Sequence, residues 1–243
     1  MADSAPRKLY MLQLSCVAAP LGAGRTMEMV NACYLVEAAG GRHILIDTGM
    51  AADARSANAP PARNEISVIE HLAALGIPPD DITTVICTHF DVDHAGYHDA
   101  FTKAEFIVQR EHYELARSGH PRYAAARAHW DHPALSYRLI DGDTEILSGL
   151  TLLETSGHAP GHQSVLVRLP NSGPVLLAID AVMMQRLFTL DRKAWSNDDN
   201  EAQLRESTQK LLDLVEHENI QLVVFGHDGQ QWQALKKSPA YYD

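Results

Sequence analysis

Four side chains of the types that bind metal ions fall within six residues of one another: His89, Asp91, Asp93 and His94. Three more follow at wide spacing, each shortly after an apolar run typical of a strand: His158, Asp180 and His227. Imidazole and carboxylate groups suit borderline divalent ions such as zinc. Two neighbouring ions need several such ligands, a carboxylate between them and open positions for water. The pattern therefore predicts a centre for two divalent ions.

The elements that must position these ligands are indicated by short apolar runs. In the first half of the chain, such runs predict strands over residues 9–14, 32–37, 43–47, 83–88 and 106–109. In the second half they predict strands over residues 137–140, 151–155, 164–169, 175–179 and 221–225. The turn-rich segment 38–41 predicts a hairpin between the second and third runs. Because most ligands follow a predicted strand, they are expected to meet at one edge of a rigid sandwich.

Three helical stretches are expected between these strands. Apolar residues recur at helical spacing over 66–75, with Asn64 as the expected N-cap and Gly76 as the expected stop. A second stretch is expected over residues 111–130, and a third over residues 204–215. This order of elements predicts an α+β fold in which two sheets pack face to face beneath outer helices. The chain shows neither a linker nor a repeat, so residues 1–243 are expected to form a single domain.

Composition excludes several classes of partner. The chain carries 31 acidic and 20 basic residues, a net charge of −11, which argues against a nucleic-acid partner. No apolar run approaches the length of a membrane-spanning helix, and the first residues do not resemble a secretion signal, so a cytoplasmic location without membrane contact is expected. Cysteines occur only in apolar runs, where free buried thiols are expected: Cys16, Cys33 and Cys87.

Several motifs follow one another in a fixed order: Cys33-Tyr-Leu-Val, Leu45-Ile-Asp-Thr-Gly49, Thr88–Gly96, Ile107-Val-Gln-Arg110, Gly157-His-Ala-Pro-Gly-His-Gln-Ser164, Leu177-Ala-Ile-Asp180 and Phe225-Gly-His-Asp228. Together they cover most of the chain and resemble the metallo-β-lactamase superfamily. Within it, they are most similar to the N-acyl-homoserine lactonases, which are quorum-quenching enzymes. The resemblance implies an αββα sandwich with a metal centre.

Roles for individual residues follow from the resemblance. It implies one ion held by His89, Asp91 and His158. It implies a second ion held by Asp93, His94 and His227, with Asp180 as the bridge between the two. Asp47 matches an aspartate that supports the ligand loop without touching metal. His162 is expected to support the site rather than to bind an ion.

Two positions depart from the lactonase pattern. The family motif H-x-H-x-D-H reads His-Phe-Asp-Val-Asp-His here, so Asp91 replaces a histidine. A carboxylate is a harder, charged ligand, which shifts the expected preference of the first ion toward manganese, iron or cobalt. Met183 stands where the lactonases carry a tyrosine that assists the substrate carbonyl, so that donor is either missing or supplied by another residue such as Tyr97 or Tyr123.

The expected cofactors are two divalent ions, with zinc as the leading candidate. Such ions lower the pKa of a shared water toward about 7, which provides a hydroxide at neutral pH. This bridging hydroxide is expected to attack the carbonyl carbon of an N-acyl-homoserine lactone or a similar small lactone. Asp93 is expected to be the catalytic residue, because it can accept the proton of the water and pass it to the leaving oxygen.

Other functions remain open at this stage. The same fold acts on other esters, thioesters or phosphoesters, and the carboxylate at position 91 is also compatible with a non-hydrolytic diiron protein. A monomer and a homodimer are both compatible with the sequence. A screen of lactones, thioesters and β-lactams with protein reconstituted in several metals would separate these alternatives.

Overall fold

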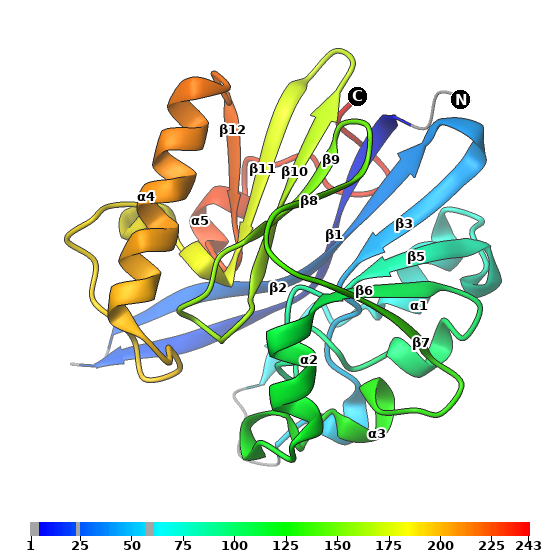
Figure 1. Cartoon of the computed structure of the whole chain (residues 1–243), viewed down its shortest axis with the longest axis horizontal. Helices are drawn as coiled ribbons and strands as arrows, with labels where there is room; N and C mark the ends of the chain where they lie inside the picture. The colour runs from blue at the N-terminus through cyan, green and yellow to red at the C-terminus, as the bar shows by residue number, and fades with distance from the viewer. Residues whose placement is uncertain (1–4, 23–24, 57–60) are drawn as a thin grey trace.

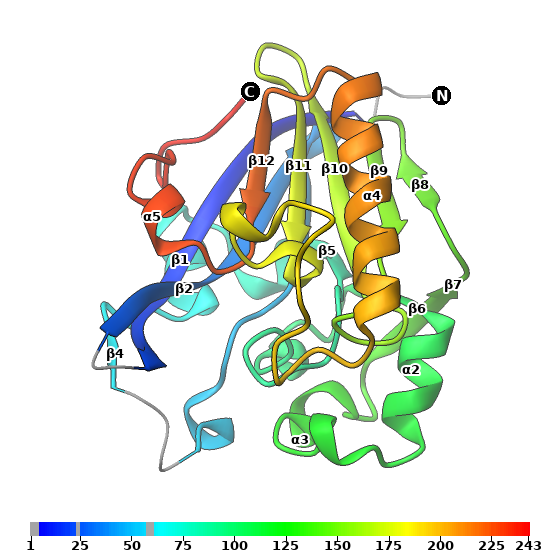
Figure 2. The same ribbon diagram turned by 90° about the vertical axis from the view of Figure 1, so that its left-hand side faces the viewer.

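Two β-sheets lie face to face at the centre of the molecule, and helices cover the outer face of each sheet (Figure 1). This computed structural model describes residues 5–22, 25–56 and 61–243. Seen from the side, helix α4 (Glu201–His217) runs along the outer face of the smaller sheet (Figure 2). The predicted αββα sandwich is thereby confirmed.

The larger sheet has seven strands in the order β4-β1-β2-β3-β5-β6-β7. Their bounds are β1 Pro6–Gly22, β2 Arg25–Ala38, β3 Arg42–Ile46, β4 Ala62–Arg63, β5 Ile82–Ile86, β6 Glu105–Gln109 and β7 Ser136–Ile140. Strands β2 and β3 pair antiparallel, which confirms the predicted hairpin. Strands β3, β5, β6 and β7 pair in parallel, so their carboxyl ends share one edge of the sheet.

The smaller sheet has five strands in the order β12-β11-β10-β9-β8. Their bounds are β8 Thr144–Leu147, β9 Leu150–Glu154, β10 Gln163–Leu169, β11 Gly173–Ile179 and β12 Leu222–Phe225. Strand β10 is antiparallel to both β9 and β11, and β12 is parallel to β11. Strands β9, β11 and β12 therefore run in one direction and end at the same edge.

Three apolar layers hold the sandwich together, because both faces of each sheet are covered. Along β1, Leu9 and Met11 pack against the other sheet, whereas Tyr10 and Leu12 pack toward the helices. This alternation follows from the period of two in a strand. The third layer lies between the smaller sheet and α4, where Leu211 joins the core. Apolar patterns in the sequence therefore specify which strands are buried on both faces.

The remaining helices are short. The α-helices other than α4 are α1 Val68–Ala74, α2 Arg110–Arg117, α3 Arg127–Trp130 and α5 Gly229–Trp232. The 3₁₀ turns are η1 Ala39–Gly41, η2 Ala52–Ala54, η3 Pro79–Asp81, η4 His98–Ala100, η5 Pro121–Tyr123, η6 Asp180–Val182 and η7 Gln185–Leu187. In the part of the chain that the structure describes, no helix combines the length and apolar character that crossing a bilayer requires.

The predicted start of the first helix was wrong. Ser67, not Asn64, is the N-cap: its hydroxyl accepts from the Glu70 N–H, and the Glu70 carboxylate accepts from the Ser67 N–H. This capping box satisfies two helix-end groups at once, which a lone asparagine three residues earlier cannot do. Asn64 instead has a φ of 53° in the preceding turn. The predicted stop is confirmed, since Gly76 adopts a φ of 73° just after the helix.

The continuous helix predicted over residues 111–130 was also wrong. Helix α2 ends at Arg117, and η5 and α3 follow as separate turns. Gly119 has a φ of 91°, and Pro121 cannot donate a helical hydrogen bond, so the chain breaks there. This break frees the segment around η5 to fold back over the ligand loops.

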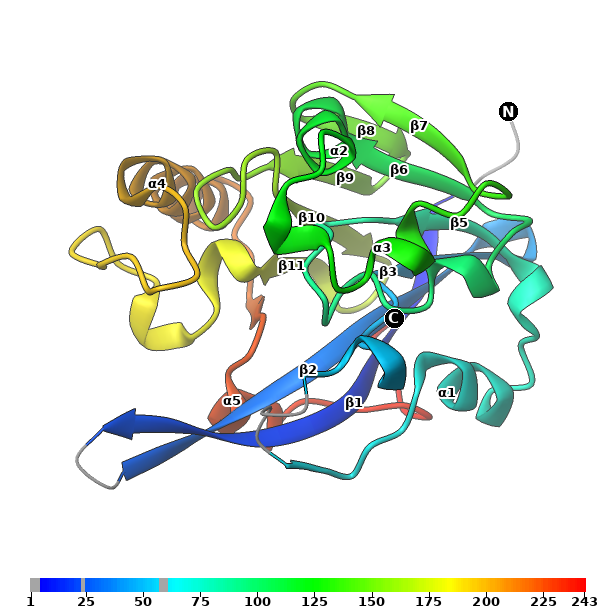
Figure 3. The same ribbon diagram turned by 90° about the horizontal axis from the view of Figure 1, so that it is seen from below.

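Three further features bear on the predictions. Strands β1 and β2 are longer than their apolar runs and form an arm that projects from the body (Figure 3). The short strands β4 and β8 and helix α5 carry too little pattern to be predicted. Cys16, Cys33 and Cys87 are buried free thiols, as expected.

Candidate metal centre

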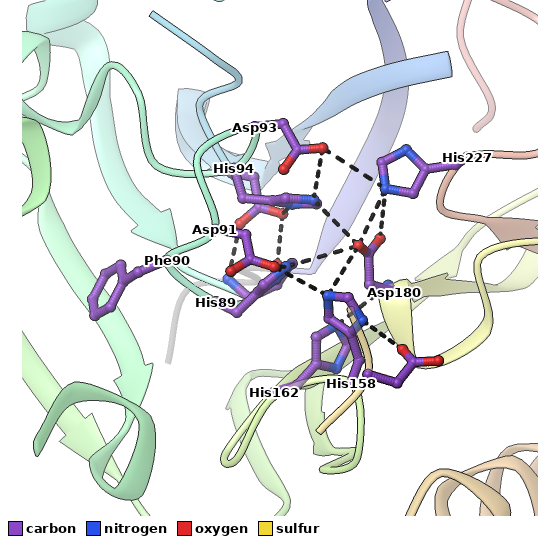
Figure 4. A network of polar contacts seen from close by, with 12 residues as sticks. His89, Phe90, Asp91, Asp93, His94, His158, His162, Asp180 and His227 are labelled. Carbon is purple, nitrogen blue, oxygen red and sulfur yellow. Dashed lines mark hydrogen bonds and ion pairs between the residues drawn. The ribbon is translucent and has the colours of Figure 1, made fainter. Parts of the chain in front are cut away.

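The seven predicted ligand residues meet at the edge where the two sheets present their strand ends (Figure 4). His89, Asp91, Asp93 and His94 lie in the loop after β5. The other three lie after strands of the smaller sheet: His158 after β9, Asp180 directly after β11 and His227 after β12. His158 and His227 are 69 positions apart in the chain. They meet because β9, β11 and β12 run in the same direction and end at the same edge of the sheet.

The loop after β5 separates ligand side chains from core side chains. Phe90 points away from the cluster (Figure 4) and is fully buried, stacked on Trp130 with ring centroids 4.7 Å apart. Its backbone N–H donates to His112 Nε2 at 2.8 Å, while His112 Nδ1 lies 2.7 Å from the carbonyl oxygen of Pro160. His112 therefore ties the loop after β5 to the loop that carries His158.

A first group, called the first site, consists of His89, Asp91 and His158, and Asp180 lies beside it. Asp91 Oδ2 lies 3.5 Å from His89 Nε2 and 3.2 Å from His158 Nε2. Asp180 Oδ2 lies 3.4 Å from His158 Nε2 and 3.8 Å from His89 Nε2. A tetrahedral zinc ion with bonds of about 2.1 Å has ligand atoms about 3.4 Å apart. The residues of the first site fit such an ion.

A second group, called the second site, consists of Asp93, His94 and His227, and a third group, His89, His94 and Asp180, shares a histidine with each site. Asp93 Oδ2 lies 3.9 Å from the Nε2 atoms of both His94 and His227. Asp180 Oδ2 lies 3.7 Å from His94 Nε2, and Asp180 Oδ1 lies 3.1 Å from His227 Nε2. The Asp180 carboxylate thus faces both sites, as a bridge between two ions must.

Each of the four histidines is oriented through its Nδ1 atom. The Nδ1 partners are Thr88 Oγ1 for His89 at 3.0 Å, Asp47 Oδ2 for His94 at 2.7 Å, Asp198 Oδ1 for His158 at 2.8 Å and the Val30 carbonyl oxygen for His227 at 2.9 Å. The Nε2 atoms are left to face the centre, and among the described residues those of His89 and His94 have no hydrogen-bond partner although they are buried. Buried polar atoms of this kind call for a ligand, and a metal ion is the natural one.

Asp47 and His162 lie behind the ligands. Asp47 accepts hydrogen bonds from the Thr88 N–H at 2.8 Å and the Thr88 hydroxyl at 2.7 Å, in addition to facing His94. His162 Nε2 accepts from the Asp180 N–H at 3.3 Å, and His162 Nδ1 lies 3.0 Å from Thr155 Oγ1. Neither belongs to any of the three ligand groups, and each fixes the backbone or the ring of a residue that does.

The charges of the cluster favour cations. Burial lowers the pKa of His94, but Asp93, Asp47 and Asp180 outweigh it and raise that pKa to about 10. Burial likewise raises the pKa of the Asp180 carboxyl, but His227 and His94 outweigh it and hold that pKa well below its usual range. The Asp180 carboxylate therefore stays ionised, and positive charge is stabilised beside it.

Two residues in contact with the site were missed by sequence reasoning. Asp198 holds His158, and Arg122 donates to Asp91 from its Nε and Nη2 atoms. Both are far from their partners in the chain, and each stands in a polar segment that gives no signal of its own. Only the three-dimensional contact identifies them.

A cavity of about 450 Å³ opens above the centre, and its floor includes side chains from both sites: Asp91, Asp93, His158, Asp180 and His227. Tyr97 and Met183 also line the cavity. Tyr123 does not: it is 1% exposed and packs against His112 with ring centroids 4.9 Å apart. Apolar side chains form much of the wall: Leu14, Val17, Met29, Met50, Ala51, Ala52, Ala62 and Ile66. The segment between Met50 and Ile66, both of which line the cavity, includes residues 57–60, which lie outside the described residues.

A larger hollow, of about 980 Å³, lies elsewhere on the molecule, beside α5. Leu222, Gln231 and Leu235 are among its lining residues, and none of the seven ligand residues borders it. The volume of a cavity therefore does not identify the candidate active site of this protein. The smaller cavity does, because candidate metal ligands line it.

Comparisons with known proteins agree with this geometry. The model of the metallo-beta-lactamase superfamily matches residues 27–227. An N-acyl homoserine lactonase of a Bacillus species is 35% identical over 254 residues, covering 97% of this chain and 98% of the relative. The N-acyl homoserine lactonase of Azorhizobium caulinodans is 34% identical over 270 residues, with the same coverage.

Solved structures give the same result. A quorum-quenching N-acyl homoserine lactone lactonase superposes with a TM-score of 0.86 at 32% identity, covering 99% of this chain and 100% of that chain. A second structure, an N-acyl homoserine lactone hydrolase with its product N-hexanoyl-L-homoserine bound at the catalytic metal centre, gives 0.85 at 30% identity, covering 98% and 100%. The match in sequence and fold extends over nearly the whole length of both chains, and this protein belongs to the metallo-beta-lactamase superfamily, within the family of the N-acyl homoserine lactonases.

Proposed function

We propose that this protein hydrolyses the lactone ring of N-acyl homoserine lactones. The observation that carries the proposal is the convergence of seven imidazole and carboxylate ligands beneath a cavity with an apolar wall. The relatives named as N-acyl homoserine lactonases support the same substrate class. A ring that carries a polar amide and an apolar acyl chain suits a cavity with one polar and one apolar side.

The proposed cofactors are two divalent ions, with zinc as the leading candidate because four of the seven ligands are imidazoles. His89, Asp91 and His158 would hold one ion and Asp93, His94 and His227 the other, with Asp180 between them. When bound, such ions lower the pKa of water and polarise a carbonyl oxygen. Asp47 and His162 would keep the ligand loop and Asp180 in place from behind.

Asp93 is the proposed catalytic acid–base group. Its side chain is 23% exposed and lines the cavity, so a water molecule and a substrate can reach it. Asp93 would take one proton from the water that adds to the carbonyl carbon. When the ring C–O bond breaks, the same proton would pass to the leaving oxygen, giving a free hydroxyl and a carboxylic acid, which releases its own proton to the solvent.

The substrate is proposed to lie between Tyr97 and the apolar wall. The Tyr97 hydroxyl would supply the hydrogen bond that a tyrosine at the position of Met183 supplies in the lactonases. The acyl chain would lie along Met29, Met50 and Ile66, which are apolar and border the cavity. An N-hexanoyl and an N-decanoyl chain differ only in apolar length, so their relative rates measure how far this wall extends.

The setting of the enzyme is proposed from its composition. The net charge of −11 supports action on a small molecule without nucleic acid. We further propose that the protein acts in the cytoplasm, away from membranes, as one domain in a monomer or a homodimer.

A direct assay tests the proposed function. Purified protein reconstituted with zinc, manganese or cobalt should release acid from N-hexanoyl and N-decanoyl homoserine lactone, measured with a pH indicator. A thioester and a β-lactam serve as comparison substrates. Metal analysis of the same samples shows whether both sites are filled. If all lactones stay intact while two ions per chain are bound, the lactonase proposal is wrong.

A further inference from the structure

Arg122 makes an ion pair with Asp91, the residue that replaces a histidine of the family motif. Arg122 lies in η5, and its side chain is 16% exposed. Its Nε donates to Asp91 Oδ1 at 2.7 Å, and its Nη2 donates to Asp91 Oδ2 at 2.6 Å. Both carboxylate oxygens are thus held by one planar guanidinium group, an arrangement with strong geometric preference.

The same guanidinium reaches His158. Nη2 lies 2.9 Å from His158 Nε2, and Nη1 donates to the His158 carbonyl oxygen at 2.8 Å. A guanidinium can only donate, so the contact with Nη2 requires a lone pair on Nε2, and the ring proton then lies on Nδ1, which faces Asp198 Oδ1 at 2.8 Å. Nε2 also lies 3.2 Å from Asp91 Oδ2. Asp199 Oδ1 accepts from Nη1 at 2.9 Å and helps to hold the guanidinium in place.

These contacts involve the ligand atoms of the first site. Asp91 Oδ2 is the oxygen that faces His89 Nε2 and His158 Nε2. A carboxylate oxygen can accept from Nη2 and still bind an ion, but an imidazole nitrogen has only one lone pair. At His158 Nε2, a bound ion and the Nη2 hydrogen bond therefore exclude each other.

The second site is free of this competition. Among the described residues, no arginine or lysine forms an ion pair with Asp93, and none donates a hydrogen bond to Nε2 of His94 or His227. The ligands of the second site are those of the family motif without substitution.

We propose that Arg122 is a built-in cation that competes for the first site, so that the two sites bind their ions with unequal affinity and the second site fills first. The inference rests on the proposed two-ion centre but not on the substrate. To admit the first ion, Nη2 must leave His158 Nε2, while Nε can stay on Asp91 Oδ1. Arg122 thereby offsets the charge that Asp91 adds and keeps its carboxylate oriented.

The test is a titration of the full chain, stripped of metal, with Zn²⁺ against a chromophoric chelator. The wild-type protein should show two steps of unequal affinity. Arg122→Met removes the guanidinium and keeps much of the apolar stem, so the weaker step should become about tenfold tighter, the scale on which groups around a metal site act. Arg122→Lys keeps the charge but cannot span the carboxylate, and its weaker step should fall between the two.

Two controls separate this effect from others. Arg127→Met removes a nearby arginine that pairs with Asp131, away from the ligands, and should leave both steps unchanged. In Asp91→His, Arg122 still has His158 Nε2 as a partner, so adding Arg122→Met to Asp91→His should again tighten the weaker step.

The outcomes are distinct. Two equal steps in the wild type, or a weaker step that loosens in both Arg122→Met and Arg122→Lys, would overturn the proposal. Binding of fewer than two ions by every variant would instead refute the two-ion centre. Because no substrate is used, a negative lactone assay leaves the result unaffected.

Discussion

Asp91 and Asp93 are two residues apart, yet their carboxylates lie in different surroundings. Asp91 is held by Arg122 through both oxygens, whereas the charged nitrogens nearest to Asp93 Oδ2 are imidazole Nε2 atoms 3.9 Å away. A carboxylate fixed by a guanidinium is a poor proton acceptor. At the residue scale, these surroundings are consistent with the proposed role of Asp93 in proton transfer.

Replacing Asp93 tests this assignment. In Asp93→Asn the amide cannot accept a proton, and kcat/KM for N-hexanoyl homoserine lactone should fall by about 100-fold or more. Metal content is measured in parallel, because Asp93 is also a proposed ligand. A loss of less than about fivefold with full metal content would rule out the acid–base role.

Tyr97 and Tyr123 form a matched pair for the substrate donor. Tyr97→Phe should lower kcat/KM about tenfold, the value of one hydrogen bond made to the reacting carbonyl. Tyr123→Phe should leave kcat/KM near the wild-type value, because the cavity lining does not include Tyr123. The reverse ranking would place the donor on the η5 segment.

At the scale of elements, the ends of strands carry conformational strain beside the ligands. Asp47 has a φ of 59° just after β3, and Ile179 has a φ of 51° just before Asp180. A β-branched residue rarely adopts such an angle, and strain of this kind concentrates at functional sites. The strand ends thus turn sharply, which places Asp47 behind His94 and Asp180 between the two sites.

Gly226 provides a test of how tightly these ends pack. A Cβ atom at this position would lie 2.6 Å from Asp180 Oδ1 and 2.6 Å from the Ile179 carbonyl oxygen. Gly226→Ala should therefore displace Asp180, lower the free energy of unfolding by about 1–3 kcal/mol and reduce bound metal. Denaturant titration and metal analysis measure the two effects.

Gly173→Ala is the control for that variant. Gly173 has a φ of 71° but open space around its missing side chain, so alanine there costs stability through backbone strain alone. Its metal content should match the wild type. If Gly226→Ala also retained full metal content, the close packing around Asp180 would not be needed for ion binding.

At the scale of the whole molecule, the centre joins the two sheets. Four ligands follow β5 of the larger sheet and three follow strands of the smaller sheet. Bound ions would therefore act as cross-links between the halves of the sandwich, and their binding free energy would add to the stability of the fold.

Removal of metal tests the cross-link. Dialysis against a chelator should lower Tm by about 10 °C, since ligands at about 1,000 times Kd contribute roughly 4 kcal/mol and a chain of this size shifts by about 2–4 °C per kcal/mol. Restoring Zn²⁺ should recover the original Tm. An unchanged Tm, with metal loss verified, would show that the ions do not hold the sheets together.

Buried histidines set an acid limit on stability. Burial, with a smaller contribution from His129, lowers the pKa of His98 to about 3. The unfolded chain takes up a proton at this residue below pH about 6.5, whereas the folded chain does not. Stability from His98 is therefore present above that pH and is lost as pH falls toward 3, by up to about 1.4 kcal/mol per pH unit.

The variant His98→Phe should reduce that slope. Denaturant unfolding of metal-stripped protein between pH 4 and 7 measures it, and stripping removes the separate effect of acid on metal binding. His98 is fully buried and packs against Phe106 with ring centroids 5.1 Å apart, so phenylalanine suits the site. Equal slopes in both proteins would show that His98 does not titrate between the two states.

The sequence by itself determined which residues are available for the chemistry and which strands are buried. Alternation in residues 9–12 places Leu9 and Met11 on one face and Tyr10 and Leu12 on the other, a local property of an extended chain. The ordered motifs indicated the sandwich, and their strand-end ligands meet as expected. Helix limits were less certain, because capping by Ser67 and the break near Gly119 depend on details that apolar periodicity does not contain.

Only the tertiary structure decided how these residues are paired. Arg122 and Asp91 are 31 residues apart, and Asp198 and His158 are 40 residues apart, so neither pair leaves a periodic signal. Tyr97 and Tyr123 are equivalent as sequence candidates, but only Tyr97 borders the cavity. Local patterns reflect short-range geometry, whereas a site is built from groups that chain folding brings together over long distances. For this protein, the tertiary structure shows that Asp91, an unusual candidate ligand, also forms an ion pair with Arg122.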